Sequence, residues 1–594
     1  MSTSRRQFLT TSAALLAGAS AGAGAALADV KPPSTTDDVI GANGTAGGTI
    51  TDGTIVEASK LAGLDYSQKE RSQLLRTIGD LLRDAQSHRG LTLANGAQPG
   101  VRFDPRLPGR EFRAQSGGIT LSAPSTAPLP ATDADIAYAP LTQLSAWIKS
   151  GAISSQRLTA LYLKRLREIG PRLNCVVTIN GRRALETARQ RDAELAAGNY
   201  RGPLHGIPYG LKDLLDTAGI TTTWGAAPYK DRLPETDATV VSRLDEAGGV
   251  LVAKLSLGAL ALDDIWFGGK TLNPWNLREG SSGSSAGPGA AVAAGLVGFA
   301  LGTETLGSII APSMRCGVTG LRPTFGRVSR HGAMALCWSL DKIGPMTRRI
   351  EDAALVLGVI NGFDAKDAGS IDAAYEFDAG AAVRGARIGY APAWFEGPGV
   401  TATDRAALGA VKDAGMKLVE IDDFPPLPYA ALLSVIFAES AAAFSELTLS
   451  GRDDLMRRQD DSGWPNTFRQ SRFLSAVDLL QAERVRRLLM VAMDEKMKGL
   501  DALISPSFAD PLLVATNYTG HPSLTLRAGM VKRPTRSNSD DPGPDPGADT
   551  PGPLFTEPHG ITLWGPLFEE GRLANIGMAL ERRFDVWHLR PPVG

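Results

Sequence analysis

The stretch GSSGSSAGPGAAVAAGLVGFALGTETLGS, from Gly280 to Ser308, contains five serines and eight glycines but no histidine, cysteine or basic residue. A serine hydroxyl attacks a carbonyl group efficiently only when a nearby base accepts its proton. Read alone, a glycine- and serine-rich run of this kind is more typical of a flexible loop or a helix-packing surface. If a serine in this stretch is a nucleophile, its base has to come from another part of the chain.

Lys212 is the candidate base, because it ends the apolar run in GIPYGLKD (206–213). A lysine is protonated at neutral pH unless burial disfavours the ammonium form and lowers its pKa. The apolar residues before Lys212 and the turn expected after it favour such burial.

Further motifs follow in order along the chain: NPWN (273–276), GSSAGPGAAVAAG (283–295), GTETLGS (302–308) and CGVTGLRPT (316–324). Together with GIPYGLKD they resemble the amidase signature family, serine hydrolases whose catalytic unit is Ser, cis-Ser and Lys. The likeness begins near Leu141 and continues through NYTGHPSLTLRAG (517–529) and GITLWGP (560–566). Several motifs in the same order make a stronger signal than any one of them.

The resemblance implies a role for each matching residue. Ser308 corresponds to the nucleophile, Ser284 to the bridging serine, which enters through a cis Gly283–Ser284 bond, and Lys212 to the base. Ser285 is expected to support the network by hydrogen bonding. The implied oxyanion hole is formed by the backbone N–H groups of Thr305, Leu306, Gly307 and Ser308. This chemistry requires no cofactor and no metal.

The chain departs from the family pattern near both serines. Ala286 and Pro288 replace small flexible residues after the bridging serine, and Glu304, Leu306 and Ile310 replace an aspartate, a glycine and an arginine around the nucleophile. If position 306 needs a positive φ, leucine would be strained and the N–H donors misaimed. A catalytically impaired periplasmic protein that binds a ligand or partner is therefore an alternative function.

The fold class is α/β. Short apolar runs at 175–179, 249–255 and 386–392 alternate with helical stretches, such as the one after Ser154 or Ser155. This alternation indicates a sheet with helices on both faces. The resemblance makes it the layered α/β/α amidase signature fold, with a central mixed sheet.

The first 28 residues read as a twin-arginine signal peptide. Arg5 and Arg6 precede a run rich in alanine, glycine and leucine, and Ala26-Leu27-Ala28 is a typical cleavage site. A membrane anchor is the alternative, but so much glycine and alanine makes a weak span. We expect a periplasmic or secreted bacterial protein with no stable membrane anchor, whose partner during export is the twin-arginine translocase.

The remaining chain divides into two predicted parts. Residues 29–135 form an N-terminal extension with one helix near 67–87, which begins with the capping box Ser67-x-x-Glu70. Residues 136–594 form the catalytic domain. Its Pro/Gly/Asp-rich segment 532–553 cannot bury a core and is expected to be an exposed loop.

Composition limits the partners. The 62 lysines and arginines against 63 aspartates and glutamates give a net charge of -1, which offers no field for nucleic acid. We expect an amidase acting on a small, neutral amide other than a peptide, with esterase activity from the same machinery. A component of a tRNA-dependent amidotransferase would use the same catalytic unit, but its partner is a cytoplasmic polyanion. A homodimer is compatible with the sequence.

Overall fold

The computed structural model describes residues 50–91, 93–397, 399–509, 511–536 and 553–593. The predicted signal peptide, residues 1–28, lies outside the described residues. The chain forms two compact units, Met1–Thr92 and Leu93–Gly594. Within the described ranges, no helix has the length and apolar character needed to cross a bilayer.

The described part of the first unit is a pair of helices, α2 (Asp52–Ala62) and α3 (Gln68–Gln86), followed by the short η1 (Ser87–Gly90). α3 begins directly after Ser67, whose backbone N–H donates to Glu70 at 2.8 Å. Arg71 of α3 pairs with Asp52 at 2.9 Å and joins the two helices. The helix expected near 67–87 is therefore present, with the capping box at its start.

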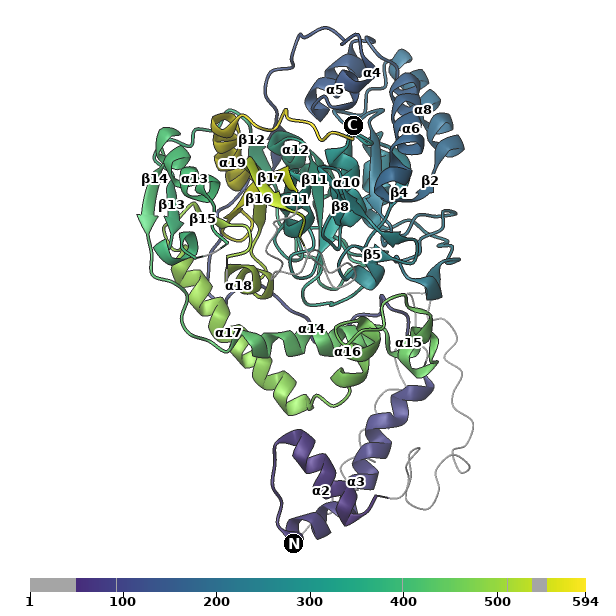
Figure 1. Cartoon of the computed structure of the whole chain (residues 1–594), viewed down its shortest axis with the longest axis vertical. Coiled ribbons are helices and arrows are strands. Elements are labelled where there is room, and N and C mark those ends of the chain that lie inside the picture. The colour runs from purple at the N-terminus through teal and green to yellow at the C-terminus, as the bar shows by residue number, and fades with distance from the viewer. Residues whose placement is uncertain (1–49, 92, 398, 510, 537–552, 594) are drawn as a thin grey trace, which may run out of the picture. The chain divides into compact units, whose positions relative to one another are not determined.

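The second unit is built on one mixed sheet of eleven strands (Figure 1). In spatial order these are β14 (Lys417–Glu420), β13 (Arg387–Tyr390), β15 (Ala502–Pro506), β17 (Leu554–Trp564), β16 (Ser523–Pro534), β10 (Thr319–Arg322), β11 (Lys342–Thr347), β9 (Phe299–Glu304), β3 (Pro208–Lys212), β4 (Val250–Leu255) and β2 (Val176–Ile179). β9, β3 and β4 run parallel to one another, whereas β11 pairs antiparallel with β9.

Helices surround this sheet. They include α4 (Asp133–Ala137), α5 (Leu141–Lys149), α6 (Ser155–Glu168), α8 (Gly181–Ala196), α9 (Thr239–Glu246), α10 (Ala286–Ala293), α11 (Ile310–Cys316), α12 (Ile350–Ile360), α13 (Ala402–Asp413), α14 (Tyr429–Ala443), α16 (Trp464–Ser471), α17 (Ala476–Met497), α18 (Leu512–Tyr518) and α19 (Glu570–Phe584). Ser154 caps α6 by accepting from the N–H of Arg157 at 3.0 Å.

The two faces of the sheet carry separate cores, as β9 shows. Phe299 and Leu301 pack in one apolar cluster with Ile350 of α12, while Ala300 packs in the other with Ala290 of α10. Because successive side chains of a strand point to opposite faces, α12 and α10 cover opposite sides of the sheet. This is the layered α/β architecture predicted from the sequence.

The segment before α4 belongs to the large unit. Ile119 of β1 (Gly118–Thr120) pairs with Phe377 of β12 (Glu376–Asp378), and the Phe103 ring lies 5.1 Å from the Phe325 ring. The compact units divide at residues 92 and 93, so residues 93–135 of the predicted extension belong to the same unit as the sheet.

The predicted loop 532–553 connects the two strands of a long hairpin. β16 continues to Pro534 and β17 begins at Leu554, so residues 532–534 are strand rather than loop. Arg533 explains the extension, because its guanidinium pairs with buried Glu557 on the neighbouring strand. Residues 537–552 of the predicted loop lie outside the described residues.

Candidate active site

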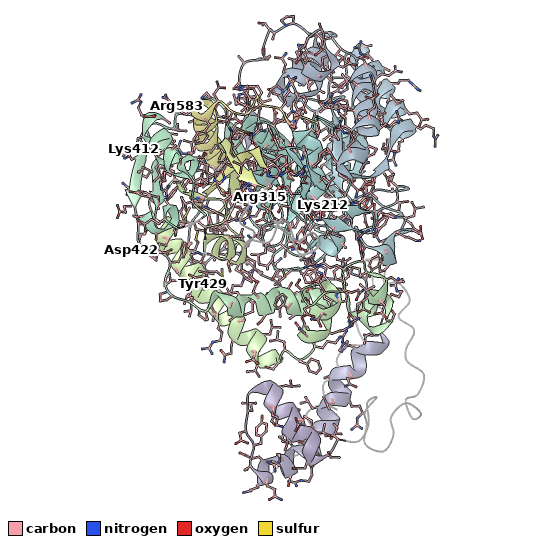
Figure 2. The ribbon with its side chains drawn as sticks, in the orientation of Figure 1. Lys212, Arg315, Lys412, Asp422, Tyr429 and Arg583 are labelled. Atoms are coloured by element: carbon pink, nitrogen blue, oxygen red, sulfur yellow. The ribbon has the colours of Figure 1, made fainter. Side chains whose placement is uncertain are left out.

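Lys212 is the last residue of β3, and its side chain is fully buried (Figure 2). β9 runs parallel to β3, so the carboxyl ends of both strands lie at the same edge of the sheet. The turn Thr305–Ser308 directly follows β9. The parallel pairing thus brings Lys212 and the serine-containing turn to one edge, although 96 residues separate Lys212 from Ser308 in the sequence (308 minus 212).

Four oxygen atoms surround the Lys212 amine. Nζ lies 2.8 Å from Ser284 Oγ, 2.8 Å from Thr303 Oγ1, 3.1 Å from Ser285 Oγ and 3.3 Å from the Thr303 carbonyl oxygen. None of these partners is a carboxylate. Burial therefore dominates and lowers the pKa of Lys212 to about 7, although the charges of Asp341 and Glu304 oppose the shift.

Ser285 fixes the hydrogen-bond pattern around this amine. Its hydroxyl donates to the Thr303 carbonyl at 3.0 Å and accepts from the Thr303 N–H at 3.1 Å. The remaining lone pair of Ser285 Oγ can take one N–H of Lys212, and Thr303 Oγ1 can take another. A neutral amine then directs its single lone pair at the hydroxyl of Ser284.

The serine pair stands immediately before α10, and the Gly283–Ser284 peptide bond is cis, as expected from the resemblance. The Ser285 N–H donates to the Ser308 carbonyl at 3.1 Å and joins the serine pair to the nucleophile turn. Ser284 is 1% exposed and Ser308 8% exposed, so the expected nucleophile is the more accessible hydroxyl. Within the described chain, Ser308 Oγ has no hydrogen-bond partner.

The turn after β9 presents free backbone donors. In the part of the chain that the structure describes, the N–H groups of Thr305, Leu306, Gly307 and Ser308 have no acceptor. The positive φ of this turn, 91°, falls on Gly307, and Leu306 is not among the residues with positive φ. Leucine at position 306 is therefore unstrained, which removes the reason for expecting misaimed donors.

Glu304 is fully buried, and its hydrogen bonds fix the position of the residues that directly follow this turn. Its carboxylate accepts from the N–H groups of Ile309 at 2.8 Å and Ile310 at 3.0 Å, and it pairs with Arg322 at 2.6 Å. Arg322 thus supplies the positive charge that the sequence lacks at position 310. The substitutions at 304 and 310 leave the start of α11 anchored directly after Ser308.

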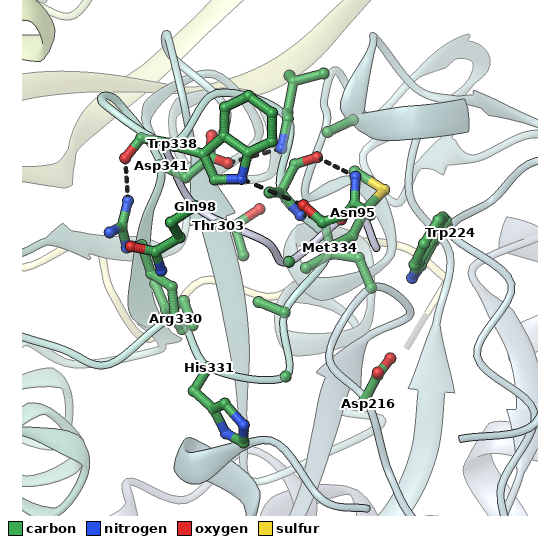
Figure 3. Close-up of a pocket in the computed structure, with 18 of the residues that line it drawn as sticks. Asn95, Gln98, Asp216, Trp224, Thr303, Arg330, His331, Met334, Trp338 and Asp341 are labelled. Atoms are coloured by element: carbon green, nitrogen blue, oxygen red, sulfur yellow. Dashed lines mark hydrogen bonds between the residues drawn. The ribbon is translucent and has the colours of Figure 1, made fainter. Parts of the chain in front are cut away.

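A pocket of about 500 Å³ adjoins this site (Figure 3). Thr303 and Thr305 line it on the catalytic side, and Leu214, Trp224, Met334 and Trp338 supply much of its apolar wall. Lys212, Ser284 and Ser308 themselves do not line it. The pocket therefore reaches the predicted oxyanion turn from the side of Thr303 and Thr305.

Two residues and one segment contribute to the site but were not predicted from the sequence. Thr303 binds Lys212, Asp341 accepts from the Thr305 hydroxyl at 2.6 Å, and residues 94–98 line the pocket. Thr303 belongs to the motif GTETLGS and could have been found by asking which side chains at the end of β9 face Lys212. Asp341 and residues 94–98 carry no such signal, because only the folded chain brings them to the pocket.

The model of the family described as Amidase matches residues 157–571. Among curated proteins, the chain is 32% identical over 505 residues to a glutamyl-tRNA(Gln) amidotransferase subunit from Halorhodospira halophila, covering 76% of this chain and 99% of the relative. The corresponding protein of Roseiflexus castenholzii is 33% identical over 487 residues, covering 76% and 97%.

Solved structures give a similar result. The native peptide amidase of Stenotrophomonas maltophilia aligns with a TM-score of 0.65 and 28% identity, over 76% of this chain and 98% of that one. An amidase family protein of Bacillus anthracis aligns with a TM-score of 0.63 and 27% identity, over 77% and 93%. Both comparisons extend over nearly the whole of the solved chains.

Proposed function

This chain belongs to the amidase family, whose enzymes hydrolyse the carbon–nitrogen bond of amides, and we propose that it cleaves a small, neutral, non-peptide amide through an acyl-enzyme on Ser308. The observation that carries the proposal is the set of neutral oxygen partners around buried Lys212. A buried amine with such partners is partly in its neutral form near neutral pH, and this neutral form can accept a proton from a serine hydroxyl.

The proposed reaction begins with a proton relay. Neutral Lys212 accepts the proton of the Ser284 hydroxyl, Ser284 accepts the proton of Ser308, and Ser308 Oγ forms a bond to the carbonyl carbon. The protons return along the same path to the amide nitrogen as the carbon–nitrogen bond breaks. A water molecule then attacks the acyl-enzyme, releases the carboxylic acid and regenerates Ser308. An ester would form the same acyl-enzyme, so esterase activity belongs to the proposal.

The backbone donors of the turn would stabilise the oxyanion. The N–H groups of Thr305, Leu306, Gly307 and Ser308 have no acceptor within the described ranges and can bind a negative oxygen. One such donor is typically worth about 2.7–4 kcal/mol in the transition state. Glu304 fixes the turn through Ile309 and Ile310, so the donors need little reorganisation. This arrangement favours a competent enzyme over an impaired binding protein.

The pocket supports a small substrate of low charge. Its volume of about 500 Å³ suits a small molecule, and Trp224 and Met334 offer apolar contacts. Apart from the exposed Lys366, the charged side chains of its wall have partners within the protein. Arg232 makes two hydrogen bonds of 2.6 Å to Asp216, Arg330 pairs with Asp367, Asp341 accepts from the Thr305 hydroxyl, and Lys342 donates to Asn517. An apolar acyl or aryl group fits such a wall better than a free carboxylate or ammonium.

We also propose that the protein is exported by the twin-arginine translocase and acts in the periplasm or outside the cell. Arg5, Arg6 and the cleavage site after Ala28 support this location. Replacement of Arg5 and Arg6 by lysine should retain the unprocessed chain in the cytoplasm, which cell fractionation and intact mass would detect. Processing and export of the double variant at the wild-type level would contradict the proposal.

A second candidate function comes from the curated relatives, which are named as parts of a glutamyl-tRNA(Gln) amidotransferase and match over 97–99% of their length. Such a role requires partner chains and tRNA, and the net charge of -1 supplies little attraction for tRNA. The two candidates differ in a simple assay. The purified chain alone should release ammonia or an amine from a small amide, whereas a component of an amidotransferase should need its partners.

Labelling of the mature protein with a fluorophosphonate tests the site, because this reagent forms a covalent adduct with an activated serine. We expect one adduct in the wild type, none in Ser308→Ala and slow formation in Lys212→Ala, measured by intact mass. Ser281→Ala is the matched control, since Ser281 is buried in the same serine-rich segment but its hydroxyl, among the residues that the structure describes, bonds only the Ser282 carbonyl. A folded wild type that forms no adduct would overturn the proposed function.

A further inference from the structure

Residues 94–98, here called the strap, form one wall of the pocket that adjoins the catalytic residues. Ala94, Asn95, Gly96 and Gln98 line the pocket together with Thr303 and Thr305 on its catalytic side. Ala94, Gly96 and Ala97 are also exposed to solvent. The strap therefore lines the pocket and is at the same time accessible to solvent.

The side-chain amide of Asn95 fixes the strap by bonding both the N–H and the carbonyl of one backbone residue, Ala335. Its Oδ1 accepts from the Ala335 N–H at 2.7 Å, and its Nδ2 donates to the Ala335 carbonyl at 2.9 Å. The Trp338 indole N–H donates to the Asn95 carbonyl at 3.2 Å (Figure 3). One side chain thus ties the strap to the segment that carries the apolar wall of the pocket.

A second attachment holds the other end of the strap. Gln98 donates to Asp367 at 2.8 Å, and Asp367 is paired with Arg330 at 2.9 Å. Arg330 lines the same pocket. The strap is consequently anchored at both ends to side chains or backbone of the pocket wall.

The strap lies outside residues 157–571, the part of the chain that matches the Amidase family model. The catalytic side of the pocket, with Thr303 and Thr305, lies inside that part. The pocket is thus assembled from the family's catalytic region and from a segment that the family model does not contain. A feature added from outside the catalytic region can change which substrates fit without changing the chemistry.

We propose that the strap determines substrate size: it closes the outer end of the pocket, so that the enzyme accepts short, compact amides and rejects long ones, with Asn95 as the residue that keeps it closed. This inference rests on the proposed function, because it assumes that the acyl or amine part of the substrate enters this pocket from Ser308. Loss of the Asn95 bonds should allow the strap to move outward and admit longer chains.

The test uses a series of n-alkyl fluorophosphonates from methyl to decyl and measures the second-order rate of adduct formation at Ser308. We expect the wild-type rate to fall steeply beyond a limiting chain length. Asn95→Ala should raise the rate for the longest reagents about tenfold relative to methyl, which corresponds to the loss of roughly one net hydrogen bond holding the strap. Each rate is divided by the methyl rate of the same variant, so that a uniform change in the reactivity of Ser308 does not affect the comparison.

Gln115→Ala is the matched control. Gln115 makes the same kind of two-sided contact, with Nε2 donating to the Phe568 carbonyl at 2.6 Å and Oε1 accepting from the Glu376 N–H at 3.1 Å. It belongs to the same N-terminal segment but does not line the pocket. Gln115→Ala should therefore leave the dependence on chain length unchanged, and Gln98→Ala provides a second, milder change within the strap.

The possible results separate the two proposals. No adduct at Ser308 with any reagent in the folded wild type would overturn the proposed function itself. Adducts that form with the same dependence on chain length in wild type, Asn95→Ala and Gln98→Ala would overturn the role of the strap alone. An equal loss of rate for all reagents in Asn95→Ala, with Gln98→Ala unchanged, would also overturn it, because the strap would then only support the fold.

Discussion

Lys212 and Lys254 are two fully buried lysines on neighbouring parallel strands, and a carboxylate lies next to only one of the two amines. Lys254 lies 3.4 Å from the carboxylate of Asp213 and also donates to the Leu215 carbonyl at 2.7 Å. Among the described residues, Lys212 has hydroxyl and carbonyl partners and no carboxylate partner. Burial lowers the pKa of both amines, but at Lys254 the adjacent carboxylate opposes that shift directly.

The strand register explains why Asp213 pairs with the distant lysine rather than with its sequence neighbour. Lys212 is paired with Leu255 and Leu211 with Lys254, so the two lysines point to opposite faces of the sheet. Asp213 accepts from the N–H and hydroxyl of Thr223 and faces Lys254. A carboxylate therefore lies beside Lys254, whereas none is bonded to Lys212, the proposed base.

The largest expected effect comes from removing the base itself. Lys212→Met should lower the rate of amide hydrolysis and of fluorophosphonate labelling about 10³-fold, since general base catalysis contributes on that order. The matched change on the other strand is the double variant Asp213→Asn with Lys254→Met, which neutralises a buried pair. That variant should keep the labelling rate within a few-fold of wild type. A comparable loss of rate in both would show that the two lysines do not differ in function.

A second prediction concerns stability rather than rate. Asp213→Asn alone leaves Lys254 buried without its carboxylate, and breaking a buried pair on one side typically costs about 3–5 kcal/mol of unfolding free energy. Urea unfolding monitored by tryptophan fluorescence should show this loss. Adding Lys254→Met should recover most of it, because no charged group is then left unpaired. A single variant as stable as wild type would mean that Lys254 carries little charge in the folded protein.

The sequence predicted the α/β fold class, which the large mixed sheet and its helices confirm, and it singled out the central residues of the proposed site. Lys212, Ser284 and Ser308 stand in motifs with local signals, and their elements follow from apolar runs and glycine-rich turns. Asp341 and residues 94–98 could not be assigned, since only the folded chain brings them to the pocket. The capping box predicted α3 well because its hydrogen bonds are local, whereas the boundary at residue 92 reflects long-range contacts.

The pH dependence sharpens the comparison of the two lysines. The proposed base works in its neutral form, and its pKa is about 7, so the labelling rate should rise with pH and reach half its maximum near pH 7. The sign follows from the direction of the shift: below pH 7 the amine is protonated and inactive, and above it the lone pair is available. The variant with Asp213→Asn and Lys254→Met should show the same midpoint. A midpoint that moved in this variant would make the Asp213–Lys254 pair part of the titration.

The smallest expected effect tests whether the neutral partners of Lys212 tune it. Thr303→Val removes one hydroxyl acceptor from the amine while keeping the shape of the side chain. The ammonium form has three N–H donors to satisfy and the neutral form two, so the loss disfavours the ammonium form more and should lower the pKa of Lys212 by about one unit. The midpoint of the labelling rate should then move to lower pH, and Thr303→Ser, which keeps the hydroxyl, should restore it. A slower Thr303→Val with an unchanged midpoint would assign Thr303 to packing and leave the carboxylate beside Lys254 as the difference between the two buried lysines.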